Sequence, residues 1–507
     1  TVATETATTS TTTTTTDAVP ESKPVSSFVP ENVDALPVSE RKTLAESAKG
    51  AGNKLFIEKN YTEAIDLYSQ AIALHPTAIY YSNRAACYSN LGKFEKVVED
   101  STESIKLDPV YIKAINRRAQ AYEKLDDLRS ALKDYTTLCV LEEFKSEASL
   151  NSMDRVMKRL GKDQAAEIMK TRKFQLPSET FITAYMDSFR QTSAHAQRII
   201  DLTPVEEGDR LVQSSFRLIL ERKYTEASEA AFKACDSPLS DAFKYHAFNI
   251  RGTFSFLKGD VNAAFADFEE AIKLNPNDID SLIKRASIFM ERGDIASTLQ
   301  ELDSAEKINS QESDLYYHRG QVRFLTEQFA PAVEDYKKSI ALDSNFVYAH
   351  IQLGVTLYKM GSVMEAMAVF RKATNKFENS FEVYNYHGEI LLDQGNFTDA
   401  LANFKKASSM QPNSPLPYIN QAILHLSSTQ DIAEAEALCR KAIEVDPLCD
   451  IAYAQLAQLL LQQKKTTEAL QIYDTAISIT RSEPELINAI ACREAAVAHI
   501  YVSEVRP

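Results

Sequence analysis

Tryptophan is absent from this chain, glycine occurs only 13 times in 507 residues, and no run of about 18 apolar residues is found. Few glycines leave few sites for tight turns, while Ala, Leu, Glu and Lys are abundant, so the composition favours helices. The lack of a long apolar run predicts that no segment of this sequence spans a membrane. A helical globular protein is therefore expected.

Positive charge is also in short supply. The 56 Lys and Arg residues are outnumbered by 71 Asp and Glu residues, which gives a formal net charge of −15 at pH 7. Because general nucleic-acid binding needs a basic footprint, we expect no nucleic-acid partner. The six cysteines are scattered and form no C-x-x-C pair, which is typical of a reduced protein that faces the cytosol.

Motifs of catalysis are missing as well. The sequence contains no phosphate-binding loop and no H-E-x-x-H spacing, and its eight histidines are isolated from one another. We interpret His318 and His387 as groove or packing residues and not as catalytic bases. The sequence therefore predicts a protein that is not an enzyme, with no catalytic residue, no metal site and no cofactor. An enzyme with an unrecognised site is the alternative that stays open.

Residues 1–40 differ in composition from the rest. Eleven of the first sixteen residues are threonine, and prolines follow at positions 20, 24, 30 and 37. Such a segment cannot bury a core, so we predict a disordered tether. The chain begins with Thr1 and not with methionine, which indicates a fragment or a processed form whose upstream anchor or targeting signal is not seen.

An internal repeat of 34 residues dominates the remainder. Five consecutive units start at 245, 279, 313, 347 and 381, a further clear unit starts at 45, and weaker ones start at 78, 112, 208, about 415 and 450. Gly at position 8, Ala at 20 and an aromatic residue at 24 recur: Gly52, Ala64 and Tyr68; Gly252, Ala264 and Phe268; Gly320, Ala332 and Tyr336; Gly354, Ala366 and Phe370; Gly388, Ala400 and Phe404. Small residues allow two helices to approach closely while the aromatic ring fills the space between them. This is the tetratricopeptide pattern of stacked helical hairpins.

The predicted fold is an all-α tetratricopeptide-repeat superhelix of about eleven repeats in two blocks. Residues 41–139 form a three-repeat block, residues 140–207 a helical connector, and residues 208–507 an eight-repeat block. One extra residue interrupts the unit near residues 427–430. A terminal helix over residues 482–505 is expected to cover the last repeat.

Five positions in the first block carry the functional signal. In such stacks, positions 2, 5, 6 and 9 of each first helix line the concave groove. The groove residues of interest are Lys49, Asn53, Asn83, Lys113 and Arg117. Three cations and two amides suit an anionic ligand with a backbone to hydrogen-bond, and a peptide with a free terminal carboxylate meets both needs.

The alternative is that these five are ordinary solvated surface residues. Two comparisons within the sequence favour the functional interpretation. The units at 245 and 450 do not repeat the set at the same positions. Residues 45–136 also carry equal numbers of basic and acidic side chains, so the net charge of −15 lies entirely in the rest of the chain. The cations are placed locally.

The five residues match, in order, the dicarboxylate clamp of chaperone-binding tetratricopeptide domains. The resemblance implies that this block binds the acidic C-terminal tail, Glu-Glu-Val-Asp, of the seventy- and ninety-class heat-shock chaperones. It further implies that Lys49, Asn53, Asn83 and Lys113 hold the terminal carboxylates, with Arg117 reaching the peptide further along.

A wider resemblance covers residue 40 to the C-terminus. The clamp, the connector phrases "CVLEEFKSEASL" and "LPSETFITAYMDSF", and eight repeats containing "YYHRGQ" resemble the seventy-kilodalton family of preprotein import receptors of the mitochondrial outer-membrane translocase. That resemblance implies a receptor on the mitochondrial outer membrane that faces the cytosol. Its membrane contact would be an N-terminal anchor absent from this chain, and its other partners would be translocase subunits. Chaperones would dock at the clamp, and hydrophobic mitochondrial precursors would bind the C-terminal groove.

Groove positions in the units at 313, 347 and 381 are the predicted precursor site. They are Tyr317, His318, Gln321, Tyr348, Gln352, Asn385 and Glu389. Mixed aromatic and amide side chains suit varied peptides. Ordinary packing between repeats is the alternative for each of them. For the protein as a whole, the alternative is a soluble tetratricopeptide co-chaperone or adaptor that organises heat-shock chaperones without a membrane anchor.

Overall fold

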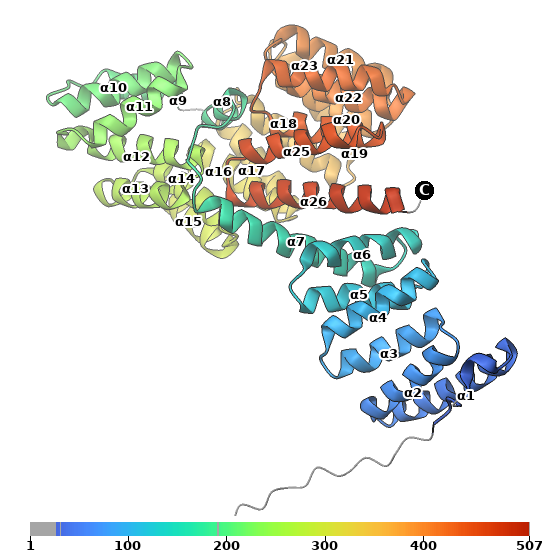
Figure 1. Ribbon diagram of the computed structural model, residues 1–507. Coiled ribbons are helices and arrows are strands. Elements are labelled where there is room, and N and C mark those ends of the chain that lie inside the picture. The colour runs from blue at the N-terminus through green and yellow to red at the C-terminus, as the bar shows by residue number, and fades with distance from the viewer. Residues whose placement is uncertain (1–26, 31, 190–191, 506–507) are drawn as a thin grey trace, which may run out of the picture. The chain divides into compact units, whose positions relative to one another are not determined.

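The computed structural model describes residues 27–30, 32–189 and 192–505. Within this part of the chain, 26 α-helices and one short 3-10 helix, η1 (Val33–Ala35), form the regular structure (Figure 1). The all-α prediction is confirmed. The helices divide into two compact units, one up to Val156 and one from Met157 onward. We call them the N-terminal unit and the C-terminal unit.

The N-terminal unit consists of three helical hairpins and the start of α7 (Glu147–Met169). Its hairpins pair α1 (Val38–Ile57) with α2 (Tyr61–Leu74), α3 (Ala78–Asn90) with α4 (Phe94–Leu107), and α5 (Ile112–Lys124) with α6 (Leu128–Leu141).

The C-terminal unit consists of eight hairpins, the rest of α7, two short helices and a terminal helix. The short helices are α8 (Glu179–Asp187) and α9 (Thr192–Ile200), and the terminal helix is α26 (Glu483–Val505). The hairpins pair α10 (Glu207–Leu220) with α11 (Tyr224–Cys235), α12 (Asp241–Lys258) with α13 (Val261–Leu274), α14 (Ile279–Glu291) with α15 (Ile295–Ile308), α16 (Ser313–Leu325) with α17 (Phe329–Leu342), α18 (Val347–Lys359) with α19 (Val363–Lys376), α20 (Phe381–Asp393) with α21 (Phe397–Met410), α22 (Leu416–Thr429) with α23 (Ile432–Val445), and α24 (Asp450–Gln462) with α25 (Thr466–Ile479).

The repeated glycine and aromatic positions meet inside each hairpin, as predicted. Gly388 on α20 lies against Phe404 on α21, and a Cβ added to the glycine would come within 2.6 Å of the ring. Phe404 is fully buried. The same contact recurs at Gly52 and Tyr68, Gly252 and Phe268, Gly320 and Tyr336, and Gly354 and Phe370. Gly at position 8 is therefore required because the aromatic ring of position 24 occupies the space of its side chain.

A second repeated contact was not predicted. In five units an Arg at position 7 of the first helix forms an ion pair with a carboxylate at position 23 of the second, at distances of 2.5–3.0 Å. The pairs are Arg84–Asp100, Arg118–Asp134, Arg251–Asp267, Arg285–Glu301 and Arg319–Asp335. Their carboxylates are largely buried, so these pairs hold the two helices of a hairpin in one register.

The boundaries of the units differ from the predicted domains in detail. Most of the predicted tether, residues 1–26, lies outside the described residues. Its last part packs on the first repeat instead: Phe28, Val29 and Val33 contact the cluster around Ala45 and Ala48. The predicted connector, residues 140–207, is divided between the two units at Val156.

The end of the chain matches the prediction closely. Helix α26 begins at Glu483 and packs on α25, and Leu486 and Ile490 also contact Ala165 of α7 within the C-terminal unit. The predicted extra residue is also visible, because α22 has 14 residues whereas the first helices α14, α16, α18 and α20 have 13 each. The eleven hairpins and the covering helix confirm the predicted tetratricopeptide architecture.

Candidate functional site

The first helices of the three N-terminal hairpins carry the five predicted clamp residues. Lys49 and Asn53 lie on α1, Asn83 on α3, and Lys113 and Arg117 on α5. Asn53, Asn83 and Arg117 line one cavity of about 270 Å³. Its remaining lining consists of Phe56, Ile57, Tyr68 and Ala86. The structure therefore brings three of the five predicted residues together, from three successive hairpins.

The amide of Asn53 is held in a defined orientation. Its Oδ1 accepts hydrogen bonds from the hydroxyl of Tyr68 at 2.7 Å and from Nδ2 of Asn83 at 3.3 Å. Because both bonds use the oxygen, the NH₂ group of Asn53 has no partner among the described residues. Two polarised N–H donors thus remain for a ligand, and a carboxylate is the acceptor that they suit best.

Arg117 supplies the positive charge of the cavity. Its Nη1 donates to the backbone carbonyl of Ser82 at 3.1 Å and to the Ser82 hydroxyl, but Arg117 faces no carboxylate among the described residues. Burial lowers the pKa of Arg117. The adjacent Arg118, by contrast, is paired with Asp134 at 2.8 Å. A half-buried guanidinium without a counter-ion is a site for an anion.

Lys49 and Lys113 do not line the cavity. Each lies on the same helix face as a lining residue, one turn before Asn53 and Arg117 respectively. Lys113 is exposed and forms no ion pair among the described residues. Lys49 instead forms an ion pair with the carboxylate of Glu46.

Glu46 is a groove residue that was missed. It occupies position 2 of the first unit, the same position that Lys113 occupies in the third. Because position 2 is one of the positions that line the groove, Glu46 could have been predicted from the sequence. One carboxylate oxygen contacts Lys49, and the other accepts a hydrogen bond from the Tyr80 hydroxyl at 2.5 Å. The bonds from Lys49 and Tyr80 lower the pKa of Glu46, so it is a carboxylate at neutral pH.

The two glycines of α1 have different roles. A Cβ at Gly52 would lie 2.9 Å from the ring of Tyr68, whereas a Cβ at Gly50 would meet no atom within 4 Å. The glycine at position 52 therefore admits the ring whose hydroxyl orients Asn53. Gly50 is not needed for close packing, because nothing lies against it.

This contrast gives a matched pair of variants in one helix. We expect Gly52→Ala to destabilise the first hairpin by about 1–3 kcal/mol through overpacking and to weaken peptide binding by displacing Tyr68. Gly50→Ala should stabilise the same helix by about 0.5–1 kcal/mol, because alanine loses less backbone entropy on folding. Hydrogen exchange over residues 38–74 measures both effects. Equal protection in the two variants would contradict the packing argument.

The predicted precursor residues are partly buried by their own neighbours. Tyr317 and Asn385 are only 3% and 2% exposed. Tyr317 packs against Phe346 with ring centroids 5.0 Å apart, and its hydroxyl accepts a hydrogen bond from Gln321 at 2.6 Å. Asn385 donates to Glu389 at 2.8 Å. The buried side chains thus position Gln321 and Glu389 and do not themselves offer a surface to a ligand.

Two other predicted residues, Tyr348 and His318, have partners within the C-terminal unit, and a third is half-buried. The hydroxyl of Tyr348 donates to Glu382 at 3.2 Å. His318 stacks against Phe189, which follows α8, with ring centroids 4.5 Å apart. Gln352 on α18 is half-buried. His387, which was interpreted as a packing residue, lies parallel to the ring of Phe370 at 5.4 Å.

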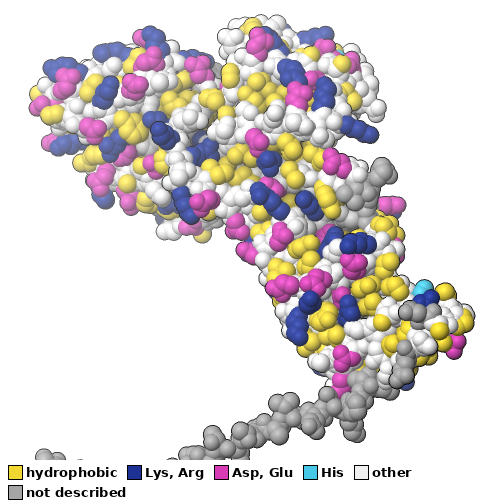
Figure 2. All heavy atoms as spheres, in the orientation of Figure 1, with side chains coloured by type: hydrophobic (Ala, Val, Ile, Leu, Met, Phe, Trp, Pro, Cys, Tyr) yellow, Lys and Arg dark blue, Asp and Glu magenta, His cyan; other side chains and the backbone are white. Residues whose placement is uncertain are grey.

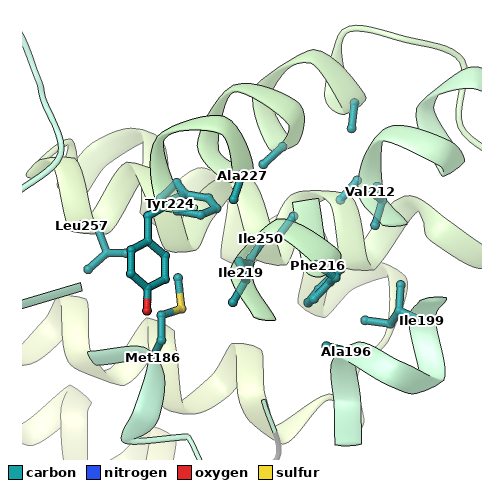
Figure 3. Packing of buried hydrophobic residues seen from close by; sticks show 14 of the residues in the cluster. Met186, Ala196, Ile199, Val212, Phe216, Ile219, Tyr224, Ala227, Ile250 and Leu257 are labelled. Atoms are coloured by element: carbon teal, nitrogen blue, oxygen red, sulfur yellow. The ribbon is translucent and has the colours of Figure 1, made fainter. Parts of the chain in front are cut away.

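A cavity of about 460 Å³ lies in the C-terminal unit, and none of the predicted precursor residues lines it. Helices α8 and α9 pack on α10 and α12 there, through the apolar cluster that includes Met186, Ile199, Phe216 and Ile250 (Figure 3). The cavity is also lined by polar side chains of α9, α12 and α14: His195, Arg198, His246, Asn249, Asp280 and Lys284.

Part of the lining of this cavity could have been predicted from the repeat positions. His246, Asn249 and Ile250 occupy groove positions 2, 5 and 6 of the unit at 245, and Asp280, Ile283 and Lys284 occupy the same positions of the unit at 279. The precursor site was instead predicted in the units at 313, 347 and 381. Met186, Phe189 and His195 come from the aperiodic connector, so no repeat position could have predicted them.

One charged pair inside this cavity, Asp280 with Lys284, is fixed. Burial lowers the pKa of His246 to about 3, so this histidine is neutral at pH 7. Burial acts to raise the pKa of Asp280, but the ammonium of Lys284 at 2.7 Å outweighs it and holds the pKa of Asp280 below its usual range. Asn249 donates to Asp280 at 3.0 Å. An apolar floor with a few convergent polar groups is typical of a ligand cavity.

The face shown in Figure 2 does not gather charge of one sign. Basic and acidic side chains are interspersed over the face shown in Figure 2, with hydrophobic side chains between them. No helix among the described residues is long and apolar enough to cross a membrane. In the same residues, no group of three or more His, Cys, Asp or Glu could hold a metal ion.

Comparison with known proteins identifies the repeat first. Family models described as "Tetratricopeptide repeat" match residues 78–111, 245–278, 313–346, 349–415 and 426–491. Together with the eleven hairpins, these matches make the chain a tetratricopeptide-repeat protein.

Its relatives are more specific. The chain is 34% identical over 267 residues to the human "Mitochondrial import receptor subunit TOM70", which covers 49% of this chain and 44% of that protein. It is 28% identical over 289 residues to the Saccharomyces cerevisiae TOM70, which covers 50% of this chain and 46% of that protein. A crystal structure of yeast Tom70 superposes with a TM-score of 0.53 at 28% identity, over 90% of this chain and 96% of that one.

The chain is homologous to the TOM70 import receptors. Its aligned part spans about half the length of the curated relatives that it matches. The likeness to the yeast crystal structure extends over nearly the whole of both chains and therefore covers the C-terminal hairpins as well.

Proposed function

We propose that this chain is a receptor for protein import into mitochondria that docks chaperones through their acidic C-terminal tails. The observation that carries the proposal is the cavity of the N-terminal unit, where the unpaired guanidinium of Arg117 lies beside the amides of Asn53 and Asn83. The homology to import receptors supports the same conclusion.

The chemistry of docking follows from the donors. A terminal carboxylate accepts hydrogen bonds from the unused NH₂ group of Asn53. Asn83 lies beside Asn53, with its Nδ2 3.3 Å from the Asn53 Oδ1. Lys49 and Lys113 reach the ligand on flexible stems from one turn away, and Arg117 contacts the peptide further along. A charge-assisted hydrogen bond contributes about 1.5–3 kcal/mol, so a few of them in an open groove give affinity on the order of micromolar. Such affinity suits transient delivery.

The C-terminal unit would accept the precursor that a chaperone delivers. Its cavity of about 460 Å³ combines an apolar floor with neutral histidines and a compensated Asp280–Lys284 pair. An apolar segment gains from burial there without leaving a charge unpaired. The predicted groove residues Gln321, Gln352 and Glu389 would extend this surface along the later hairpins.

Location and further partners are part of the proposal. The chain would act at the mitochondrial outer membrane, facing the cytosol, beside other subunits of the translocase, and an N-terminal anchor outside this sequence would hold it there. The alternative is a soluble adaptor that organises chaperones through the same clamp. The two differ in whether the C-terminal unit binds mitochondrial precursors.

Amidation of the ligand tests the clamp directly. We expect a peptide ending in Glu-Glu-Val-Asp with a free carboxylate to bind the full chain at least tenfold more tightly than the same peptide with an amidated C-terminus, since amidation removes the charge that Asn53 and the cations recognise. Isothermal titration calorimetry measures both constants. Equal affinities would contradict the clamp.

The same peptides separate the receptor from the adaptor. A radiolabelled mitochondrial carrier precursor, synthesised in a cytosolic lysate, should crosslink to the C-terminal unit, and the free-acid peptide should reduce that crosslinking while the amidated peptide does not. A cytosolic enzyme synthesised in the same lysate is the control. Crosslinking of neither protein, together with normal peptide binding, would favour the adaptor.

A further inference from the structure

One carboxylate stands on the binding face of an otherwise cationic groove. Glu46, Lys49 and Asn53 lie on a single face of α1, three and four residues apart. Glu46 is tied at both oxygens: one contacts the ammonium of Lys49, and the other accepts the hydrogen bond from the buried Tyr80 hydroxyl at 2.5 Å. Tyr80 is 1% exposed, so its ring cannot move away from Glu46 without disturbing the core.

This arrangement draws Lys49 away from the ligand. Glu46 precedes Lys49 by one turn, whereas Asn53 follows it by one turn, so an ammonium that contacts Glu46 points away from the cavity. Lys49 is accordingly not among the residues that line the cavity, although Asn53 is. A carboxylate ligand that uses Lys49 must take it from Glu46.

We propose that Glu46 is an intramolecular competitor that sets the specificity of the clamp. The inference rests on the proposed function and concerns the same site. Glu46 already pairs with the ammonium of Lys49. Lys49 therefore contributes to binding only when a carboxylate of the ligand competes with Glu46. A tail with several carboxylates meets this condition, whereas a peptide with one carboxylate gains little from Lys49. Glu46 therefore reduces the affinity for weakly acidic C-termini.

The exchange is accessible energetically. The Glu46 side chain is 49% exposed and that of Lys49 is 24% exposed, and ion pairs with this much exposure are worth at most about 1 kcal/mol. A ligand can therefore displace Glu46, but it does so at a net cost.

The test compares Glu46→Gln with a matched control in the same unit. Glu103 forms an i,i+3 ion pair with Lys106 on α4, a second helix of a hairpin, and its side chain is 47% exposed. Glu103→Gln therefore makes the same change of net charge at an equally exposed glutamate that does not face the cavity. Calorimetric titration uses the full chain and two free-acid peptides, one ending in Glu-Glu-Val-Asp and one in Gln-Gln-Val-Gln.

Glu46→Gln should tighten binding of both peptides, by about threefold for the Glu-Glu-Val-Asp tail and by a larger factor for the Gln-Gln-Val-Gln tail. Glu103→Gln should change either affinity by less than twofold. In a Lys49→Ala background, the effect of Glu46→Gln should shrink to that of Glu103→Gln. This last result separates competition for Lys49 from a general effect of charge.

The outcomes distinguish the inference from the proposed function. If the wild-type chain does not bind the free-acid tail, the clamp itself is refuted. If it binds and Glu46→Gln leaves both affinities unchanged or weakens them, the clamp stands and the competitor is refuted. A gain that persists in the Lys49→Ala background also overturns the inference, because Glu46 would then act without Lys49.

Discussion

Arg117→Ala is expected to weaken binding of the Glu-Glu-Val-Asp peptide by about 10- to 100-fold. The variant removes a half-buried guanidinium that has no carboxylate partner among the described residues, so its charge is available to the ligand in full. Loss of a charge-assisted contact of about 1.5–3 kcal/mol corresponds to this factor. Calorimetric titration of the full chain gives the affinity, and circular dichroism checks that the helical content is unchanged.

Two further variants make this result specific. Arg117→Lys keeps the charge but loses the planar fork that donates to Ser82, so it should recover only part of the affinity. Lys96→Ala removes a cation from the same unit, yet Lys96 is exposed on α4 and paired with Glu99, so binding should change by less than twofold. An Arg117→Ala variant with wild-type affinity would show that the cavity is not the peptide site.

Arg319→Met should produce the largest loss of stability, about 3–5 kcal/mol within the C-terminal unit. Arg319 is 7% exposed and contacts three carboxylates, Asp335 at 3.0 Å, Glu306 at 2.6 Å and Asp303 at 3.1 Å. Removal of one partner of a buried pair leaves charge that is neither solvated nor compensated. Hydrogen exchange over α16 and α17, with and without urea, measures the local loss.

The loss should depend on pH with a definite sign. Burial raises the pKa of Asp335 above its unfolded value, so the charge of Asp335 destabilises the folded state increasingly as the pH rises. Arg319 is the main cause that lowers the pKa of Glu306, so the stability that Glu306 contributes is present at neutral pH and is lost on acidification. The difference between the wild type and Arg319→Met is therefore expected to be smaller at pH 5 than at pH 8.

Lys337→Met is the matched control for this prediction. Lys337 forms an i,i+3 pair with Glu334 on α17 at 3.0 Å, and both side chains are more than half exposed. Such a pair should contribute less than about 1 kcal/mol and show little pH dependence. If Arg319→Met is no more destabilising than Lys337→Met, the buried pairs at positions 7 and 23 do not stabilise the hairpins.

The repeat separates structural positions from binding positions within one helix. Positions 7 and 8 of a first helix face its partner: Arg118 pairs with Asp134, and Gly52 admits Tyr68. Positions 2, 5, 6 and 9 face the groove. Arg117 and Arg118 are adjacent in sequence, but Arg117 faces no carboxylate in the described part of the chain, whereas Arg118 is paired with Asp134. The difference arises because successive residues of a helix point about 100° apart. Residues at the groove positions can thus vary without loss of the stack.

The all-α class, the number of hairpins and the covering helix were determined by the sequence alone. A period of 34 residues with small and aromatic residues in fixed phase allows one way of burying each hairpin, against its neighbours in the stack. That phase also placed Asn53, Asn83 and Arg117 on one groove, and the structure gathers them in one cavity. The pairs at positions 7 and 23 were equally periodic and could have been found in the same way.

Only the tertiary structure shows which side chains form ion pairs, hydrogen bonds or ring contacts with the groove residues. The Lys49 side chain can extend along α1 toward Asn53 or toward Glu46. The hydroxyl of buried Tyr80, from the next hairpin, fixes Glu46 by a hydrogen bond, and Glu46 in turn forms the ion pair with Lys49. In the C-terminal unit, Phe189 of the aperiodic connector reaches His318 and helps to line the cavity. A repeat fixes which face a residue occupies, because that follows from helical geometry. The rotamer of a long side chain, and the path of a segment without a period, depend on contacts between residues far apart in the chain.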